Sequence, residues 1–169
     1  MSEKDIIDPS QAPTLDTAFR ERVRRSPGAP AYRWFDKAAK GWQTVSWGEA
    51  AGQVERWRAA LAAEGLEPGD RVAVGVRNSP EWVYLDQAAL SLGLVVVPLY
   101  TDDRPDSLTW VLENAGARLV LLQDLPAWRR LAPLVEDGAA LERVVVVAPG
   151  RETPGTQPAD FGKPFDPAG

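Results

Sequence analysis

Four short apolar runs in the second half of the chain constrain its fold more than any other feature. They lie at 72–76, 94–99, 118–122 and 144–147, and each is nearly continuous in apolar residues instead of alternating with polar ones. Strands of this kind are buried on both faces, as in parallel sheets, and helical segments separate them here. The pattern predicts an α/β fold, a mostly parallel sheet wound with helices on both faces.

The helices between these runs have recognisable ends. Ser79-Pro80 predicts the cap and the first residue of a helix that reaches Leu92 and ends at Gly93. A short helix is expected over 106–115, and Asp124 is placed to cap the next one. The first, second and third runs are therefore each followed by a crossover helix.

The first half of the chain predicts a helix, a hairpin and a second helix. Apolar residues at helical spacing indicate a helix over 15–25, which ends before Ser26-Pro27. Two aromatic and β-branched runs, 31–35 and 42–46, indicate a hairpin in which we expect Trp34 and Trp42 to pair. Ser46-Trp47-Gly48-Glu49 is a capping box that opens the second helix. Its expected buried face carries Ala50, Val54, Trp57 and Leu61.

Composition divides the chain into three parts. Residues 1–13 are an N-terminal tail without the basic start and apolar core of a secretory signal, which favours a cytoplasmic protein. Residues 14–147 form the α/β unit. Residues 148–169 are rich in proline and glycine and lack periodicity, so they are expected to form a linker or a truncated end.

Charge and residue usage exclude several classes of function. The net charge of -5 is opposite to that of a nucleic-acid binder, so no nucleic-acid partner is expected. The 169 residues include no cysteine and no histidine, which removes disulfides, thiolate nucleophiles and the commonest metal ligands and general base. Any catalysis would depend on carboxylates, hydroxyls, lysine, arginine or tyrosine. No residue is predicted to be catalytic or to bind a metal.

Two loops are candidate binding sites. Tyr100, Thr101 and Asp102 follow the second strand, at the edge where open α/β sheets bind ligands. Their alternative interpretation is an exposed turn before a helix. The turn 75–80 follows the first strand and could bind an anion at a helix N-terminus, although helix capping by Asn78 or Ser79 is the simpler explanation because it needs no ligand. A basic cluster over 20–25 indicates a solvated helix face, with peripheral membrane contact as the alternative.

Five segments in order resemble the N-terminal part of the AMP-forming acyl- and aryl-CoA synthetases, an adenylate-forming family. The resemblance runs from Thr14 to about Asp124 and is most similar to the long-chain fatty acid CoA ligases. Its landmarks are Thr44–Glu49, Gly65–Val74, Asn78–Trp82, Gly93–Tyr100 and Asn114–Val120.

The resemblance implies a two-step reaction. A carboxylate attacks ATP to form an acyl-adenylate and pyrophosphate, and the thiol of CoA then displaces AMP. It implies ATP, Mg²⁺ and CoA for the parent enzyme, none of them bound tightly by this chain, because the nucleotide-binding and catalytic motifs of the family do not occur here. For this chain it implies only that Tyr100, Thr101 and Asp102 lie near the CoA nucleotide.

Three functions remain open at this point. The first is the N-terminal part of a long-chain fatty acid CoA ligase, inactive by itself, whose partner is the remainder of the ligase chain. The second is a stand-alone, non-catalytic binding module that recruits a partner through an edge strand at 144–147, and the third is a fragment of another acid-adenylating enzyme. A homodimer is a further expectation.

Overall fold

The computed structural model describes residues 6–36, 39–135 and 140–148, and every structural statement below refers to these residues. The chain begins with α1 (Leu15–Arg25), the strands β1 (Pro30–Asp36) and β2 (Gly41–Ser46), and α2 (Trp47–Ala63). Residues 1–5 of the predicted tail and 149–169 of the predicted linker lie outside the described residues. The three-part division of the chain therefore stays a prediction.

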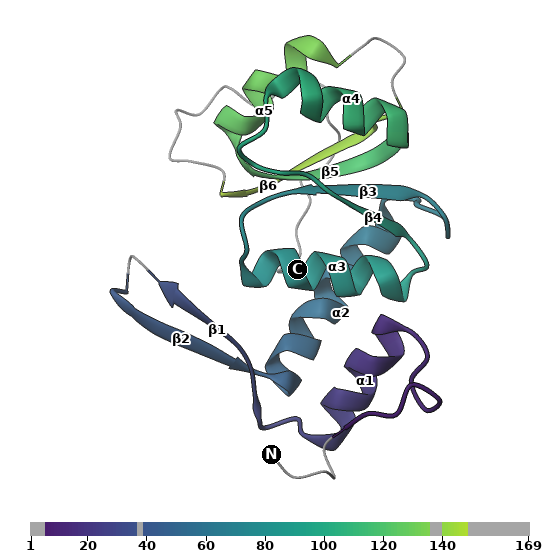
Figure 1. The fold of residues 1–169 in the computed structure, drawn as a ribbon, viewed down its shortest axis with the longest axis vertical. Coiled ribbons are helices and arrows are strands. Elements are labelled where there is room, and N and C mark those ends of the chain that lie inside the picture. The colour runs from purple at the N-terminus through teal and green to yellow at the C-terminus, as the bar shows by residue number, and fades with distance from the viewer. Residues whose placement is uncertain (1–5, 37–38, 136–139, 149–169) are drawn as a thin grey trace.

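A four-stranded parallel sheet follows. Its strands are β3 (Arg71–Gly75), β4 (Val95–Pro98), β5 (Ala117–Asp124) and β6 (Arg143–Ala148), in the order β4-β3-β5-β6. The crossovers are α3 (Pro80–Ser91), α4 (Pro105–Ala115) and α5 (Leu125–Leu131), the last continued by the 3₁₀ turn η2 (Ala132–Leu134). Figure 1 shows α2 and α3 on one face of the sheet and α4 and α5 on the other.

Successive residues of the central strands enter two separate cores. Val72, Val74 and Leu121 pack with the buried faces of α2 and α3, whereas Ala73 and Val120 pack with α4 and α5. All five side chains are 0% exposed. This double burial is the reason why the strands read as continuous apolar runs, and it confirms the predicted fold class.

The predicted helix starts and stops are confirmed. The Ser46 side chain accepts from the Glu49 amide, Ser79 accepts from Trp82, and Asp124 accepts from Ala127. Gly93 and Gly116 follow their helices with positive φ angles of 73° and 61°. Such left-handed positions are ordinary for glycine and strained for other residues.

The hairpin is confirmed, but its predicted tryptophan pair is wrong. Trp34 lies opposite Gln43, and Trp42 lies opposite Phe35, with the two rings 5.8 Å apart in an edge-to-face arrangement. A shift of one residue moves a side chain to the other face of a strand, so Trp34 faces the core while Phe35 and Trp42 are exposed. Residue type could not specify this register.

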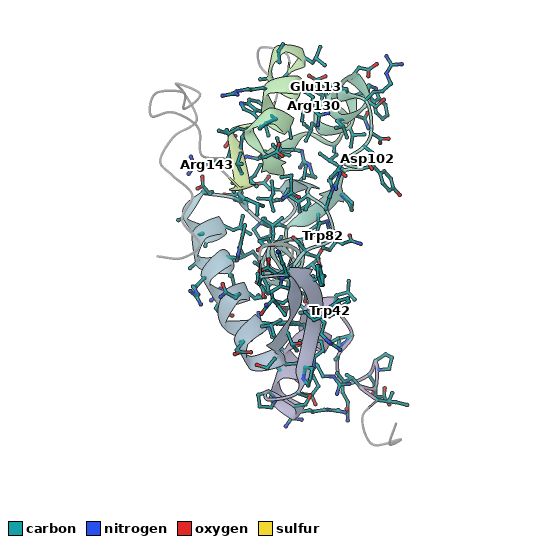
Figure 2. The ribbon with its side chains drawn as sticks, turned by 90° about the vertical axis from the view of Figure 1, so that its left-hand side faces the viewer. Trp42, Trp82, Asp102, Glu113, Arg130 and Arg143 are labelled. Atoms are coloured by element: carbon teal, nitrogen blue, oxygen red, sulfur yellow. The ribbon has the colours of Figure 1, made fainter. Side chains whose placement is uncertain are left out.

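Ion pairs connect the amino ends of neighbouring strands. Arg118 at the start of β5 forms ion pairs with Asp70, which precedes β3, and with Glu142, which precedes β6. Arg143 pairs with Glu64 at the end of α2 at 2.8 Å. The backbone amide of Glu67 and then Arg118 lower the pKa of the Asp70 carboxyl. Figure 2 shows Arg143 at the opposite side of the molecule from Asp102, which follows β4.

Candidate binding cavity at the carboxyl edge of the sheet

The order of the strands creates a natural opening at the carboxyl edge. From β3 the chain crosses to β4 on one side, and from β4 it crosses back to β5 on the other side of β3. The connections that leave β3 and β5 therefore diverge to opposite faces of the sheet. In open α/β sheets such a switch point is the usual place of ligand binding.

A cavity of about 910 Å³ occupies this position, and we call it the switch-point cavity. Gly75, Leu99 and Leu122 lie near the carboxyl ends of three neighbouring strands and contribute to its wall. A Cβ atom at Gly75 would lie 3.0 Å from Leu122 Cδ2, so this glycine lets the strands pack closely beneath the cavity. The remaining lining residues are Trp34, Phe35, Arg77, Asn78, Ser79, Pro80, Tyr100, Thr101, Asp102, Asp103, Pro105, Leu108, Gln123, Asp124, Ala127, Arg130 and Leu131.

Both loops that the sequence singled out lie in this cavity. Tyr100, Thr101 and Asp102 line it from the β4–α4 connection, and Arg77 lines it from the turn after β3. An Arg77 Nη2 atom lies 3.9 Å from Asp102 Oδ1, and the two side chains are 75% and 91% exposed. An exposed contact of this length contributes little to stability, so both groups are available to a ligand.

Hydrogen bonds within the protein account for most of the turn after β3. The Ser79 hydroxyl accepts from the Trp82 amide at 3.4 Å, which confirms the capping interpretation of this residue. The Arg77 amide donates to Gln123 Oε1 at 3.2 Å and thereby joins the turn to the end of β5. The Arg77 side chain lines the cavity and is exposed to solvent.

Sequence reasoning did not identify Trp34, Phe35 or Arg130 as residues of a binding site. Trp34 and Phe35 reach the cavity from the hairpin, and Arg130 reaches it from α5. Arg130 could have been found from the sequence, because it lies six residues after the Asp124 cap on the helix that follows a central strand. The approach of the hairpin had no local signal, because it depends on how α2 orients the hairpin against the sheet.

The cavity combines both signs of charge with aromatic surface. Arg77 and Arg130 line the cavity together with the carboxylates of Asp102 and Asp103, and the Tyr100 ring is 80% exposed. Arginine suits phosphate recognition, and an exposed ring suits stacking on a base. Among the described residues no three acidic side chains lie close enough to hold a metal ion, and we assign no metal ligand to them.

The basic cluster of α1 is largely matched by carboxylates of the same helix. Arg20 pairs with Asp16, and Arg24 and Arg25 pair with Glu21. These two arginines lower the pKa of Glu21 to about 2. No helix among the described residues is long and apolar enough to cross a membrane. Peripheral membrane contact of α1 stays a prediction.

Solved structures with the same fold define the class of protein. A fatty acyl CoA synthetase from Mycobacterium tuberculosis superposes with a TM-score of 0.69 at 22% identity, over 83% of this chain and 27% of that chain. The N-terminal subdomain of NpsA from Klebsiella oxytoca, in complex with 3-hydroxyanthranilyl-AMSN, superposes with a TM-score of 0.63 at 27% identity, over 78% of this chain and 30% of that chain. The described fold is therefore that of the N-terminal domains of adenylate-forming enzymes.

Sequence comparison gives the family. The profile described as "AMP-binding enzyme" matches residues 19–167, and the chain belongs to this family. Long-chain-fatty-acid–CoA ligase FadD15 of Mycobacterium bovis is 29% identical over 140 residues, which are 82% of this chain and 23% of that protein. The chain thus spans about a quarter of the length of this ligase. The uncharacterized protein Rv1549 of Mycobacterium tuberculosis is 30% identical over 148 residues, 87% of this chain and 80% of that protein.

Proposed function

We propose that this chain is the N-terminal part of an AMP-forming long-chain fatty acid CoA ligase. The parent enzyme converts a fatty acid, ATP and CoA into acyl-CoA, AMP and pyrophosphate. The observation that carries the proposal is the match to long-chain ligases over more than four fifths of this chain, on a fold shared with adenylate-forming enzymes. The location of the cavity at the switch point supplies the binding surface that such an enzyme needs.

In the proposed enzyme the switch-point cavity receives the nucleotide part of CoA. Arg77 and Arg130 would bind phosphate groups, and the exposed ring of Tyr100 would stack on the adenine. The Thr101 hydroxyl can donate or accept a hydrogen bond with the ribose, and the Asp102 carboxylate can accept one from a ribose hydroxyl. Bound CoA supplies the thiol that accepts the acyl group, and the groups that activate ATP are not found among these residues.

Activity of the chain by itself tests the first part of the proposal. We expect no fatty-acid-dependent exchange of pyrophosphate into ATP, with a full-length long-chain ligase as the positive control. The physical reason is that the chain lacks a phosphate-binding loop with its lysine. Substantial exchange by the purified chain with any fatty acid would overturn the assignment.

Titration with CoA, followed by amide chemical shifts, tests the cavity. We expect weak binding, with the largest shifts at Tyr100, Thr101 and Asp102. Arg130→Gln should weaken the binding about tenfold, because a charged hydrogen bond is lost. The matched control is Arg58→Gln on α2, which removes an exposed arginine outside the cavity. Shifts elsewhere, or equal weakening by both variants, would contradict the cavity assignment.

A non-catalytic interaction module is the second candidate function. It is favoured by the match to Rv1549, because this chain covers 80% of that protein. In the described part of the chain β6 pairs only with β5, so its outer edge is available to a partner.

The mass of the native product in its source cells separates the two candidates. An immunoblot against this domain should show a band several-fold larger than 18.4 kDa if the ligase proposal is right. A band at 18.4 kDa would favour the module, and the next measurement would be concentration-dependent association.

A further inference from the structure

A second hollow lies between the hairpin and the first turns of α2 and α3, and we call it the hairpin groove. Its volume is about 380 Å³. Two carboxylates contribute to its lining, and none of the lining residues is a lysine or an arginine. The residues that line it are Trp34, Thr44, Val45, Glu49, Gln53, Pro80, Glu81 and Tyr84. Its electrostatic character therefore favours a cation.

Tyr84 is the buried polar side chain of the groove. It is 7% exposed, and its hydroxyl makes no hydrogen bond with another described residue. Burial and then the charges of Glu81 and Glu49 raise its pKa, which places the hydroxyl in the field of both groove carboxylates. The hydroxyl oxygen itself is not fully buried, so it can accept a hydrogen bond from a donor that enters the groove.

Glu49 is held ionised and in a fixed position. Its Oε2 atom accepts from the Ser46 amide at 2.8 Å and from the Ser46 hydroxyl at 2.7 Å. These bonds lower the pKa of the Glu49 carboxyl. Both use the same oxygen, so Oε1 can accept a hydrogen bond from a ligand.

We propose that the hairpin groove binds the guanidinium group of an arginine side chain, presented by an extended polypeptide segment. A guanidinium carries five N–H donors, enough to reach Glu49, Glu81 and the Tyr84 hydroxyl together. Its flat face matches the indole ring of Trp34, and this stacking favours arginine over lysine. Thr44 and Val45 belong to β2, which pairs only with β1 among the described strands, so an extended segment can add at this sheet.

The direct test titrates the whole chain with N-acetyl-arginine amide and follows the indole N–H signal of Trp34. We expect saturable shifts with a dissociation constant on the order of millimolar, since a single side chain provides few contacts. N-acetyl-citrulline amide has the same shape without the charge and should produce no saturable shift. Equal binding of the citrulline compound, or no binding of the arginine compound, overturns the proposal.

Two variants locate the binding site. Glu81→Gln and Tyr84→Phe should each weaken binding about three- to tenfold, because each removes one polar contact. Glu55→Gln is the matched control, since Glu55 lies on α2 outside the groove and pairs with Arg58. Far-UV circular dichroism confirms that each variant is folded. Binding that all three variants leave unchanged overturns the proposal.

Two further probes test the chemistry of the ligand. N-acetyl-lysine amide should bind more weakly than the arginine compound, because its ammonium cannot stack or form the planar fork. A pentapeptide with a central arginine between valines should bind more tightly than the single amino acid, because it can pair with the hairpin. If the lysine compound binds as tightly as the arginine compound, the guanidinium assignment is overturned. If the pentapeptide binds no more tightly than the single amino acid, the proposal that an extended segment presents the arginine is overturned.

Discussion

Asp86 on α3 is a carboxylate in an unfavourable environment. Burial raises its pKa, and the hydrogen bond from Gln87 Nε2 at 3.0 Å opposes that shift only in part. The unfolded chain therefore releases this proton at a lower pH than the folded chain does. As pH rises from the unfolded pKa of 3.8 through the folded value, the carboxylate makes the folded state progressively less stable.

Replacement of Asp86 by asparagine should therefore stabilise the chain at neutral pH. Asparagine keeps an oxygen that accepts from Gln87 and removes the desolvated charge. We expect a higher urea midpoint for Asp86→Asn than for the parent at pH 7, and a smaller difference near pH 4. Asp102→Asn, at a side chain 91% exposed, is the control. A lower midpoint for Asp86→Asn at pH 7 would show that the charge is compensated.

Gly116 shows how one backbone conformation makes room for a hydrogen-bonded arginine side chain. Its φ of 61° is left-handed, and an added Cβ would lie 2.6 Å from Arg71 Nη2. The same arginine donates from Nε to the Ala115 carbonyl at 2.7 Å and closes the end of α4. A side chain at this position would strain the backbone and displace Arg71 together.

Alanine at Gly116 should cost about 1–2 kcal/mol of unfolding free energy, from the left-handed backbone alone. The matched control is Gly52→Ala within α2, where an added Cβ meets nothing within 4 Å. That change should be neutral or stabilise by up to about 1 kcal/mol, because alanine favours helix. Chemical denaturation measures both, and equal effects would contradict the argument.

At the scale of elements, the stability of α2 depends on the hydrogen bonds of its first turn. The Ser46 hydroxyl accepts from the Glu49 amide at 3.2 Å, and the Glu49 carboxylate accepts from the Ser46 amide. The helix that follows covers one face of the sheet and carries the hairpin at its N-terminus. The cap therefore stabilises the junction of hairpin and sheet as well as the helix.

Ser46→Ala should lower the unfolding free energy by about 1 kcal/mol, the usual value of an N-cap. Ser46→Asn should recover most of the loss, because its side-chain oxygen can also accept from the backbone. Urea denaturation of the two variants beside the parent makes the comparison. Asparagine and alanine with equal effects would indicate that the cap hydrogen bond contributes little here.

At the scale of the whole molecule, stability is concentrated in the sheet. β3 and β5 lie between other strands and carry side chains of 0% exposure on both faces. The hairpin has two strands only and exposes Phe35 and Trp42 by 52% and 63%. Two-stranded sheets are marginal by themselves, so the hairpin should open more easily than the sheet.

Native-state hydrogen exchange should therefore show two levels of protection. We expect the hydrogen-bonded amides of β3 and β5 to exchange most slowly, through global unfolding, and those of β1 and β2 to exchange through local opening. Leu121→Ala, which empties a fully buried site, should cost about 2–5 kcal/mol and reduce protection in the sheet first. Hairpin amides as slow as those of β5 would contradict this division.

The sequence by itself determined the secondary structure and the fold class. Caps at Ser46, Ser79 and Asp124 and the apolar runs of the strands act through neighbours in the chain, so they can be recognised without a structure. The loop at Tyr100, Thr101 and Asp102 was also identified, because chain order places it after a parallel strand. Its contact with a ligand remains a prediction.

Tertiary structure alone decided which distant residues meet. The register that pairs Trp42 with Phe35, and the approach of Trp34 and Arg130 to the switch-point cavity, depend on how the helices and hairpin pack against the sheet. The hairpin groove likewise combines residues of four elements, β1, β2, α2 and α3, among them Glu49 and Tyr84. Caps and apolar patterns reflect interactions between residues that are close in the sequence. The cavity and the groove form only when the helices and the hairpin pack against the two faces of the sheet and bury a core on each.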